Sequence, residues 1–329
     1  MLSILGMGAA HPDTVIDNHF LESLDIGTNP EWIEERVGIK TRRTVLPLDY
    51  IRTTRNRDPR AAQEAATHTL ADLGVAAAEQ AMARAGVSAG DIGMVICGCS
   101  VPQLFIPANA CLLAARLSIN APSFDLNSAC STFAAQIHFL NQMNMDRLPD
   151  YILLVQAETY TIVTNYDDRS TAVLWGDGAA ATVVSPRHPG KAKIITSVFK
   201  SAPADYEKVM IPRQGHFEQQ GNQVQRFAIT RTVETFEELK AQTQFGPDTY
   251  FIGHQANLRM LESSCKRTEI GYNRHLYNVN CYGNTGAAGA PSVMAANWDS
   301  FKDGDELALV VVGAGLSWGG TVLRFGENK

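Results

Sequence analysis

The chain has 329 residues, of which 45% are apolar and 19% are charged, and its formal net charge is −6. This composition allows a large buried core and excludes intrinsic disorder, which requires low hydrophobicity and a strong charge imbalance. The net charge gives no general attraction to nucleic acid or membranes, and no apolar run reaches the ~20 residues that span a bilayer. The six cysteines form no paired framework, so we expect reduced thiols, no metal site and a cytoplasmic protein.

Apolar runs alternate with helical patterns along most of the chain. Strands separated by helices are typical of βαβ units, so the pattern predicts an α/β protein. Strands are expected at residues 3–9, 91–97, 122–127, 151–157, 179–185, 193–201, 248–253, 276–280, 306–313 and 320–325. Helices are expected at residues 67–85, 108–117, 131–143, 230–244, 256–266 and 287–298.

The two parts of the chain resemble each other in the order of their elements. Trp175-Gly176 precedes one expected strand and Trp318-Gly319 precedes another. Residues 124–127 and 277–280 also match, at an offset of 153. Short apolar strands pair by chance, but the order of the matches favours a duplicated α/β unit. The N-terminal and C-terminal halves are then residues 1–186 and 187–329.

Residues 40–64 differ from the rest of the chain in charge. Seven positive and three negative side chains give this segment a net charge of +4, so the remaining residues carry −10. Pro47 and Pro59 argue against one continuous helix. We expect a basic surface loop or lid inserted into the N-terminal half.

Cys130 lies between the expected strand at 122–127 and the expected helix at 131–143. A thiol at a helix N-terminus is close to the positive end of the helix dipole, which favours the thiolate. On the repeat offset, Asn284 falls within one residue of the position equivalent to Cys130. A duplicated fold would therefore bring both residues to matching strand ends. The alternative is a buried packing cysteine and a turn asparagine.

His254 directly follows the expected strand at 248–253. The carboxyl ends of strands are where α/β sheets place reactive groups, although a structural histidine is the alternative. A thiolate, an imidazole and a carboxamide together suit acyl transfer, because the thiolate accepts an acyl group and neutral donors hold a developing enolate oxygen. The glycine-rich residues 176–181 lead into a strand rather than a helix, so they do not indicate dinucleotide binding.

These residues lie in motifs that resemble the ketoacyl-[acyl-carrier-protein] synthase III family of condensing enzymes. The motifs include Ser128-Ala129-Cys130, His254-Gln255-Ala256-Asn257, Tyr282-Gly283-Asn284-Thr285 and Leu316-Ser317-Trp318-Gly319, of which the His-Gln-Ala-Asn and Gly-Asn-Thr pieces in this order are specific. The resemblance implies a thiolase-like fold, that is, a duplicated αβαβα layered sandwich, in a homodimer. It also implies a catalytic triad of Cys130, His254 and Asn284, without a metal or another cofactor.

The resemblance implies a reaction as well. Cys130 would take an acyl group from acyl-CoA, and a malonyl thioester on an acyl carrier protein would then lose CO₂ and attack the acyl-cysteine. His254 and Asn284 would hydrogen-bond the oxygen of the malonyl thioester. The backbone N–H groups of Cys130 and Ala314 would form the oxyanion hole.

Binding residues are assigned by the resemblance alone. Trp32 and Arg169 would enclose the CoA adenine, and Arg36 would contact the CoA phosphates. Asn222 and Asn257 would line the tunnel for the pantetheine arm. A basic patch would dock the acidic carrier protein, although a solvated basic face is the alternative for its residues, Arg226, Arg259, Lys266 and Arg267.

Two departures from the family pattern bear on the acyl donor. Ile106 stands where a large aromatic residue usually reaches the partner subunit's acyl pocket, and Val312 stands in place of phenylalanine. The smaller side chains predict a donor longer than acetyl and a specialised enzyme. Two alternatives are an acyltransferase that uses an alcohol or amine without decarboxylation, and a non-catalytic partner subunit of a heterodimeric synthase. The retained triad argues against both.

Overall fold

The computed structural model describes residues 1–326, and a mixed sheet of nine strands forms its centre. The strand order is β11-β12-β13-β8-β1-β7-β6-β4-β5. The bounds are β1 (Ser3–Ala10), β4 (Ile92–Gly98), β5 (Ser123–Asp125), β6 (Tyr151–Thr159), β7 (Asp177–Ser185), β8 (Ala192–Ser201), β11 (Tyr250–Gly253), β12 (Glu306–Gly313) and β13 (Ser317–Phe325). The α/β prediction is confirmed.

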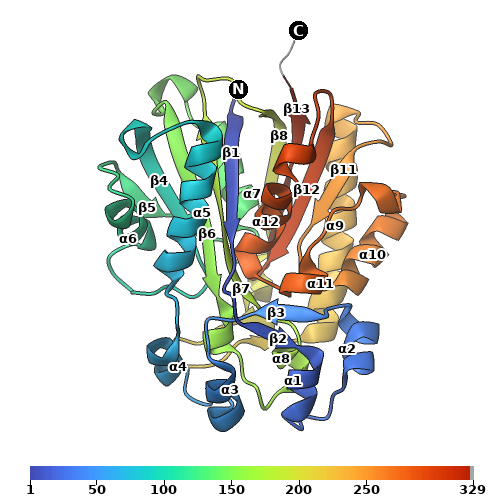
Figure 1. Ribbon diagram of the computed structural model, residues 1–329. Helices are drawn as coiled ribbons and strands as arrows, with labels where there is room; N and C mark the ends of the chain where they lie inside the picture. The colour runs from blue at the N-terminus through green and yellow to red at the C-terminus, as the bar shows by residue number, and fades with distance from the viewer. Residues whose placement is uncertain (327–329) are drawn as a thin grey trace.

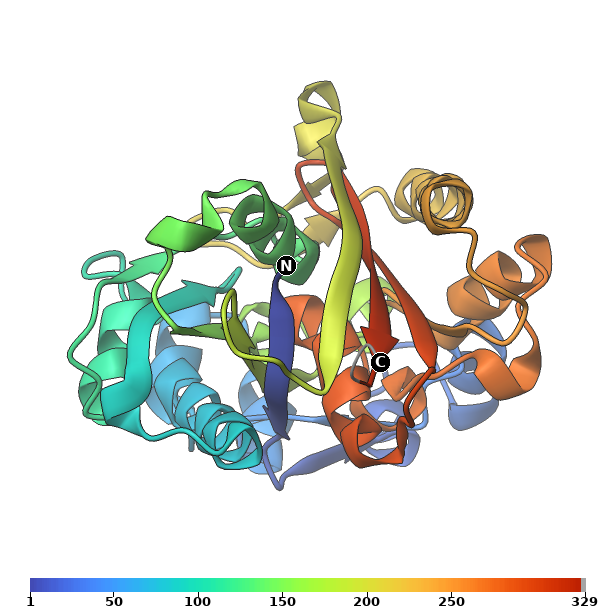
Figure 2. The ribbon, with the colours of Figure 1, turned by 90° about the horizontal axis from the view of Figure 1, so that it is seen from above.

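The strand order is symmetric about the contact between β1 and β8. Moving outward on either side, two antiparallel pairings are followed by a parallel one, through β7, β6 and β4 on one side and β13, β12 and β11 on the other. β1 and β8 pair only at Ser3↔Lys193 and Ile4↔Ala192, side by side at the middle of Figure 2. A duplicated unit predicts this symmetry, and the boundary between residues 186 and 187 stays a prediction.

Helices cover both sides of the sheet, and two lie between its halves (Figure 1). α5 and α6 flank the N-terminal half, and α9 and α10 flank the C-terminal half. Centrally, α7 packs on β8 and β13, while α12 packs on β1 and β7, so each central helix contacts strands of the other half. This arrangement confirms the layered sandwich. The helix bounds are α5 (Leu70–Ala85), α6 (Asn109–Arg116), α7 (Thr132–Gln142), α9 (Gly221–Thr243), α10 (Leu258–Arg267) and α12 (Gly289–Ala296).

Local sequence explains how α5 forms and packs. Thr69 and Asp72 make a reciprocal capping box at its start, and Gly86 ends it in the left-handed conformation, with φ of 68°. The helix lies directly on β1 because Gly8 has no side chain. A Cβ atom at Gly8 would lie 2.1 Å from the carbonyl oxygen of Ala77, so only glycine permits this close contact.

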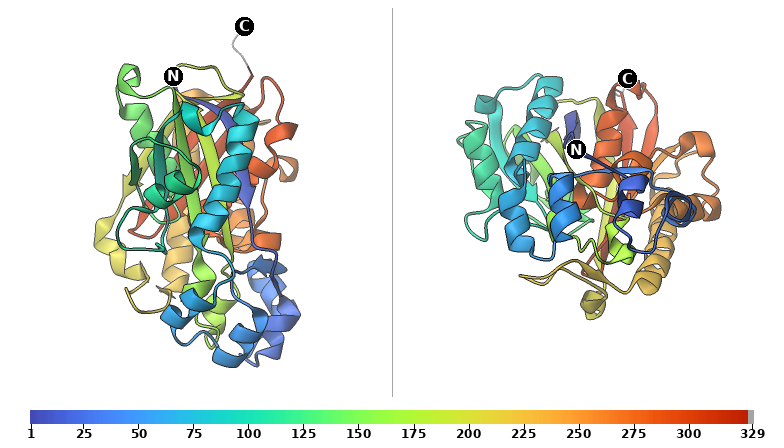
Figure 3. Two further views of the ribbon diagram at one scale, coloured as in Figure 1. Left: turned by 60° about the vertical axis from the view of Figure 1, so that its left-hand side comes forward. Right: turned by 60° about the horizontal axis from the view of Figure 1, so that its bottom comes forward.

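Smaller elements gather at one end of the sheet, at the bottom of Figure 1 and in blue in Figure 3. They are β2 (Val15–Asp17), β3 (Thr41–Arg43), α1 (Asn18–Ser23), α2 (Pro30–Val37), α3 (Leu48–Thr54) and α4 (Pro59–Ala65). Among residues 1–326, the remaining short α-helices and strands are α8 (Arg169–Ala172), β9 (Val209–Met210), β10 (Glu218–Gln219) and α11 (Val279–Tyr282).

The expectation that residues 40–64 form a surface loop is wrong in part. The segment contains β3, α3 and α4, and Arg42 is completely buried within it. Arg42 donates hydrogen bonds to the carbonyl oxygen of Val173 and, at 2.6 Å, to Oδ1 of Asn18. A guanidinium group can be buried when oxygens accept hydrogen bonds from it. A charge count along the sequence does not reveal those acceptors.

The strand expected at residues 276–280 is not formed. His275 makes one isolated bridge to Phe251, and the helix α11 follows. The side chain of Gln255 explains this difference, because its Oε1 accepts from the backbone N–H groups of Asn278 and Val279, at 3.1 and 3.2 Å. These donors are satisfied without a neighbouring strand.

Two expected helices also differ from the structure. α9 begins at Gly221, ahead of the expected start at residue 230, and the expected helix at 287–298 is a 3₁₀ turn followed by the shorter α12. The other predicted elements agree with the structure to within a few residues. In the described part of the chain, no helix is long and apolar enough to cross a membrane.

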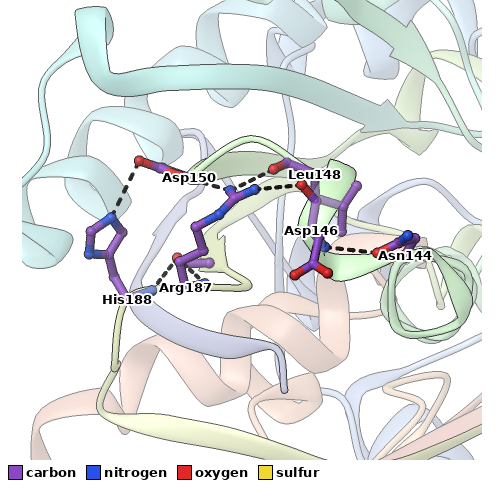
Figure 4. Close-up of polar contacts among 7 residues, drawn as sticks. Asn144, Asp146, Leu148, Asp150, Arg187 and His188 are labelled. Atoms are coloured by element: carbon purple, nitrogen blue, oxygen red, sulfur yellow. Dashed lines mark hydrogen bonds and ion pairs between the residues drawn. The ribbon is translucent and has the colours of Figure 1, made fainter.

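The segment that joins the two halves is anchored at the opposite end of the sheet (Figure 4). Nη1 of Arg187 donates to the carbonyl oxygen of Leu148, at 2.6 Å, and to Oδ1 of Asp150, at 2.8 Å. Its Nη2 donates to the carbonyl oxygen of Asp146, at 3.0 Å. The guanidinium group therefore holds the connection between the halves against the loop that precedes β6.

Candidate active site

A cavity of about 240 Å³ lies between the two halves of the molecule. Cys130 lines it from the N-terminal half, while His254, Asn284 and Ala314 line it from the C-terminal half. The structure therefore brings the three residues of the predicted triad to one cavity, although they are far apart in sequence.

Cys130 follows a sharp turn between β5 and α7. The preceding residue, Ala129, has a φ of 45°, which is unusual for a residue with a side chain. The turn is held by Oδ1 of Asn127, which accepts from the backbone N–H of Ala129 at 3.0 Å, and by the hydroxyl of Thr132, which donates to the carbonyl oxygen of Ala129 at 2.6 Å. This strained conformation places Cys130 in the wall of the cavity, directly before the helix.

The electrostatic surroundings of Cys130 oppose the thiolate that its place before a helix predicts. Burial raises the pKa of the thiol to about 12, and the nearby Glu158 adds to the rise. The hydroxyl of Tyr160, 3.9 Å from Sγ, acts in the opposite direction. Burial therefore acts on the pKa of this thiol in the direction opposite to the helix N-terminus.

His254 directly follows β11 and is buried at the cavity. Burial lowers the pKa of its imidazole to about 4, so the ring is neutral at neutral pH. Its Nδ1 is buried without a hydrogen-bond partner among the described residues. A neutral imidazole carries one N–H group, which can serve as a hydrogen-bond donor to a bound oxygen.

Asn284 is held by both its backbone and its side chain. Its backbone N–H donates to the carbonyl oxygen of Leu174 at 2.8 Å, and its own carbonyl oxygen accepts from the N–H of Gly176 at 3.0 Å. The side-chain Oδ1 accepts from the N–H of Gly286 at 3.0 Å. Because Oδ1 is occupied, the NH₂ group is the part of the carboxamide that remains available to a substrate.

The backbone of residues 313–314 lies against the turn that carries Cys130. A Cβ atom at Gly313 would be 3.0 Å from the backbone nitrogen of Cys130 and 2.8 Å from that of Ser131, so this contact requires glycine. Ala314 follows and lines the cavity. This contact is compatible with an oxyanion hole made from the N–H groups of Cys130 and Ala314, which stays a prediction.

The three residues predicted to bind CoA are close together on the surface. The guanidinium carbon of Arg169 lies 5.1 Å from the centre of the Trp32 ring, and that of Arg36 lies 5.9 Å from it. Stacked planes need about 3.5 Å between them, so a ring inserted between two others needs about 7 Å in total. An adenine between Trp32 and Arg169 would therefore require Arg169 to move. Arg169 now donates to the carbonyl oxygen of Gly27 at 2.6 Å.

Neither asparagine predicted for the pantetheine tunnel lines the cavity. Asn222 is exposed near the start of α9. Asn257 is the N-cap of α10, where its Oδ1 accepts from the backbone N–H of Met260 at 2.8 Å. Asn257 therefore has a structural role that the resemblance did not indicate, and the binding role of both residues stays a prediction.

The predicted docking patch is divided between two helices. Arg226 lies on α9 and the other three residues lie on α10, where Lys266 and Arg267 are exposed in the last turn. Arg259 forms an ion pair with Glu262 at 2.9 Å, which reduces the positive charge available to a partner. The structure does not test the docking role.

The two residues expected to shape the acyl pocket have different surroundings. Val312 is buried and lines the cavity. Ile106 is 85% exposed and lies outside the cavity of its own chain, next to Leu104 and Phe105, which are 44% and 72% exposed. The predicted role of Ile106 depends on a partner subunit and is not tested by one chain.

The sequence analysis missed an aromatic cluster beside Cys130. Tyr160 and Trp175 stack with their ring centres 4.1 Å apart, and Phe217 packs edge-on against Trp175 at 4.4 Å. All three side chains are buried and line the cavity. Trp175 was visible only as a marker of the repeat, and the position of Tyr160 after β6 was the only signal that could have identified it.

A buried carboxyl group, Glu158, was also missed. Its Oε2 accepts from the backbone N–H of Ser100 at 2.9 Å, while its Oε1 accepts from the Ser100 hydroxyl at 3.1 Å and from the N–H of Ala287 at 3.3 Å. Burial raises its pKa to about 8. Glu158 thus connects the end of β6 to the loop that follows Asn284. Among residues 1–326, no group of three or more His, Cys, Asp and Glu side chains could hold a metal ion.

A layered α/β sandwich with a cysteine, a histidine and an asparagine at one cavity defines a condensing enzyme of the thiolase-like fold. Family models described as 3-oxoacyl-[acyl-carrier-protein (ACP)] synthase III and its C-terminal part match residues 124–203 and 241–325. A beta-ketoacyl-[acyl-carrier-protein] synthase III from Coxiella burnetii is 31% identical over 98% of both chains. The chain belongs to the ketoacyl-[acyl-carrier-protein] synthase III family, and it is an acyltransferase-type condensing enzyme.

Solved structures agree with this assignment. The 3-oxoacyl-[acyl-carrier-protein] synthase III from Aquifex aeolicus VF5 superposes with a TM-score of 0.88 at 28% identity, over 99% of this chain and 100% of that chain. The priming β-ketosynthase from the R1128 polyketide biosynthetic pathway superposes with a TM-score of 0.85 at 26% identity, over 100% of this chain and 97% of that chain. The predicted thiolase-like fold is therefore confirmed.

Proposed function

We propose that this enzyme loads an acyl group from acyl-CoA onto Cys130 and condenses it with a malonyl thioester on an acyl carrier protein, releasing CO₂. The observation that supports the proposal is the convergence of a thiol, a neutral imidazole and a carboxamide donor at one cavity. No further cofactor is required, because the CoA thioester supplies the activated acyl group.

The loading step begins with attack of the Cys130 sulfur on the carbonyl carbon of the acyl-CoA. The bond from that carbon to the CoA sulfur breaks, and the proton lost from the buried thiol leaves with the CoA thiol. The negative charge that develops on the carbonyl oxygen needs fixed donors, which the backbone N–H groups of Cys130 and Ala314 would supply. The product is acyl-Cys130 and free CoA.

The condensation step uses the donors from the C-terminal half. The bond between the malonyl carbon and its carboxylate breaks, CO₂ leaves, and the electron pair forms an enolate. His254 and Asn284 would donate hydrogen bonds to the enolate oxygen, and a neutral histidine suits this role because it retains an N–H donor without titrating near pH 7. The enolate carbon then attacks acyl-Cys130, and the released thiolate is reprotonated.

Binding of the two substrates uses surfaces near the cavity. Trp32, Arg36 and Arg169 would hold the CoA nucleotide, and Asn222 and Asn257 would contact the pantetheine arm. The carrier protein would dock on Arg226, Arg259, Lys266 and Arg267. The exposed apolar residues Leu104, Phe105 and Ile106 support a homodimer in which Ile106 reaches the partner's acyl pocket.

The acyl donor is proposed to be longer or more branched than acetyl. The small Val312 in the cavity wall and the similarity to a priming ketosynthase of a polyketide pathway both support a specialised donor. Tyr160, Trp175 and Phe217 also line the cavity, and their aromatic rings limit the room that an acyl group has beside them.

The proposal is tested by incubating the protein with a panel of acyl-CoAs and measuring its mass. We expect one acyl group on Cys130, and CO₂ release when a malonyl carrier protein is added. Absence of any acyl mass would support a non-catalytic partner subunit. Acyl transfer to an alcohol or amine without CO₂ release would support the acyltransferase alternative.

A further inference from the structure

Three serine hydroxyls lie between the two loops that would form the oxyanion hole. Ser128 and Ser131 flank Cys130, while Ser317 is the first residue of β13, three residues after Ala314. Ser131 and Ser317 are buried, and Ser128 is half-buried. The three hydroxyls therefore connect the turn of the N-terminal half to the loop of the C-terminal half.

The distances among these hydroxyls describe a closed network. Oγ of Ser128 lies 3.0 Å from Oγ of Ser131 and 3.1 Å from Oγ of Ser317, and the oxygens of Ser131 and Ser317 are 2.8 Å apart. Two of the hydroxyls also reach backbone carbonyl oxygens. Ser131 donates to the carbonyl oxygen of Ser128 at 2.8 Å, and Ser317 donates to the carbonyl oxygen of Ala314 at 2.9 Å.

The three protons can satisfy all three serines at once. When Ser317 donates to Ala314, Ser131 can donate to Ser317 across the gap between the loops, and the Ser128 hydroxyl can donate to Ser317 or to Ser131. Each serine then donates one hydrogen bond, and the two backbone segments are joined through side chains. A buried network with every member satisfied restricts the geometry of the groups that it connects.

We infer that Ser128, Ser131 and Ser317 are positioning residues that fix the distance between the two N–H donors of the oxyanion hole. This inference rests on the proposed function, because it takes the donors to be Cys130 and Ala314. Gly313 keeps the two segments in contact, and the hydroxyls would set their relative position. The effect should be confined to acyl transfer at Cys130, since the decarboxylation donors lie on other loops.

The test compares Ser317→Ala with wild-type enzyme in the two half-reactions. We expect the rate constant for loading of Cys130 from acyl-CoA to fall about tenfold with an unchanged KM, which is a smaller loss than the ~10²–10³ typical of a removed donor. Single-turnover CO₂ release from a malonyl carrier protein, measured on enzyme that is already acylated, should be unchanged. Ser317→Thr, which keeps the hydroxyl, should restore loading.

Two further variants keep the test decisive. Ser128→Ala removes one of the two hydroxyl contacts across the gap, so it should repeat part of the loading defect even if Ser317→Ala does not fold. Ser185→Ala removes a buried hydroxyl at the far end of β7, where it accepts from the backbone of Arg187 and His188, and should load normally.

The possible outcomes separate this inference from the proposed function. Loading at the wild-type rate in both Ser317→Ala and Ser128→Ala would overturn the inference and leave the proposed function intact. Equal losses in loading and CO₂ release would also overturn it, because the serines would then act on general stability. A wild-type protein that loads no acyl group would instead overturn the proposed function.

Discussion

The two halves of the molecule share a strand order but differ at their outer edges. The N-terminal half ends in two parallel strands, β4 and β5, and Cys130 follows the second. In the C-terminal half the equivalent of β5 is reduced to the bridge between His275 and Phe251, and the chain forms α11 before it reaches Asn284. The comparison teaches that similar scaffolds supply different chemistry once one edge strand is lost.

The division of chemistry follows from this difference. The regular edge of the N-terminal half leads into a tight turn and a helix, which suits one fixed nucleophile. The irregular edge of the C-terminal half lets a loop bring Asn284 to the cavity that His254 also lines, which suits two donors around one oxygen. Since residues of both halves line the cavity, neither half forms it alone.

The largest effect is expected from removing the nucleophile of the N-terminal half. Cys130→Ser should gain no acyl mass from acyl-CoA, because a serine hydroxyl is a far weaker nucleophile without a base to activate it. Intact-protein mass spectrometry measures this directly. The exposed Cys281 offers a matched control, and Cys281→Ser should load as wild type does. Acyl mass on Cys130→Ser would mean that another residue is the nucleophile.

A smaller but still large effect is expected from a donor of the C-terminal half. Asn284→Ala should still load the acyl group but should lose about 10²–10³ in the rate of CO₂ release, which is the usual cost of one lost donor to an oxyanion. Labelled malonyl carrier protein gives this rate in a single turnover. Normal CO₂ release in this variant would show that the two halves do not divide the reaction as proposed.

Glu158, which connects the halves, is expected to make stability depend on pH. Its native pKa of about 8 exceeds the ordinary value of 4.5, so the native state keeps a proton that the unfolded state releases. The native state therefore loses about 2 kcal/mol of its stability between pH 6 and pH 8 through this group. Denaturant unfolding at both pH values measures the loss.

Glu158→Gln isolates this contribution, because glutamine resembles the protonated acid and does not titrate. The variant should lose less stability than wild type over the same pH range, and it should be the more stable protein at pH 8. Wild type and variant both contain Asp177, whose pKa is also raised, to about 7. Its effect on stability is the same in both proteins, so the difference between them reports Glu158. An identical pH dependence in wild type and variant would contradict the assignment.

The smallest effect is expected at Ile106, where the comparison extends from two halves to two chains. Each methylene of a longer acyl chain that is buried in the pocket contributes roughly 0.8 kcal/mol. If the larger side chain of Ile106→Phe excludes two such methylenes, preference should shift toward acetyl-CoA by roughly tenfold in kcat/KM. Competition between acetyl-CoA and a medium-chain acyl-CoA measures the shift. A wild-type preference for acetyl that Ile106→Phe leaves unchanged would disprove the pocket argument.

Much of the fold could be predicted because buried strands carry their own signal. The strand expected at 306–313 has the same bounds in the structure, and that at 3–9 differs by one residue. The prediction at 276–280 was wrong because a distant side chain, Gln255, satisfies the backbone there. The start of α9 was missed because no capping side chain marks it. Such contacts depend on the folded arrangement rather than on local pattern.

The site was predictable to a similar degree. The convergence of Cys130, His254 and Asn284 at one cavity was expected because each lies in a family motif, and Cys130 and His254 also follow strand ends. The effect of burial on the pKa of Cys130 was not predicted, since the helix N-terminus is visible in sequence while the burial of the thiol is not. Glu158 and Tyr160 were missed for the same reason, because their importance comes from contacts across the cavity.

The stack of Tyr160 on Trp175 gives the enzyme a built-in optical reporter. The indole of Trp175 is 3% exposed and lines the cavity beside Cys130. Any group attached to the sulfur must change the polarity around this ring or disturb its stacking partner. Intrinsic fluorescence should therefore follow the arrival of an acyl group in real time, without a labelled substrate.

The other three tryptophans divide the remaining signal by location. Trp32 lies in the predicted CoA site, and Trp318 packs against residues of the cavity wall. Trp298 does not line the cavity. It packs edge-on against Phe325, with 5.8 Å between the ring centres. Single Trp→Phe replacements would assign each change in emission to nucleotide binding, to acylation or to events elsewhere in the protein.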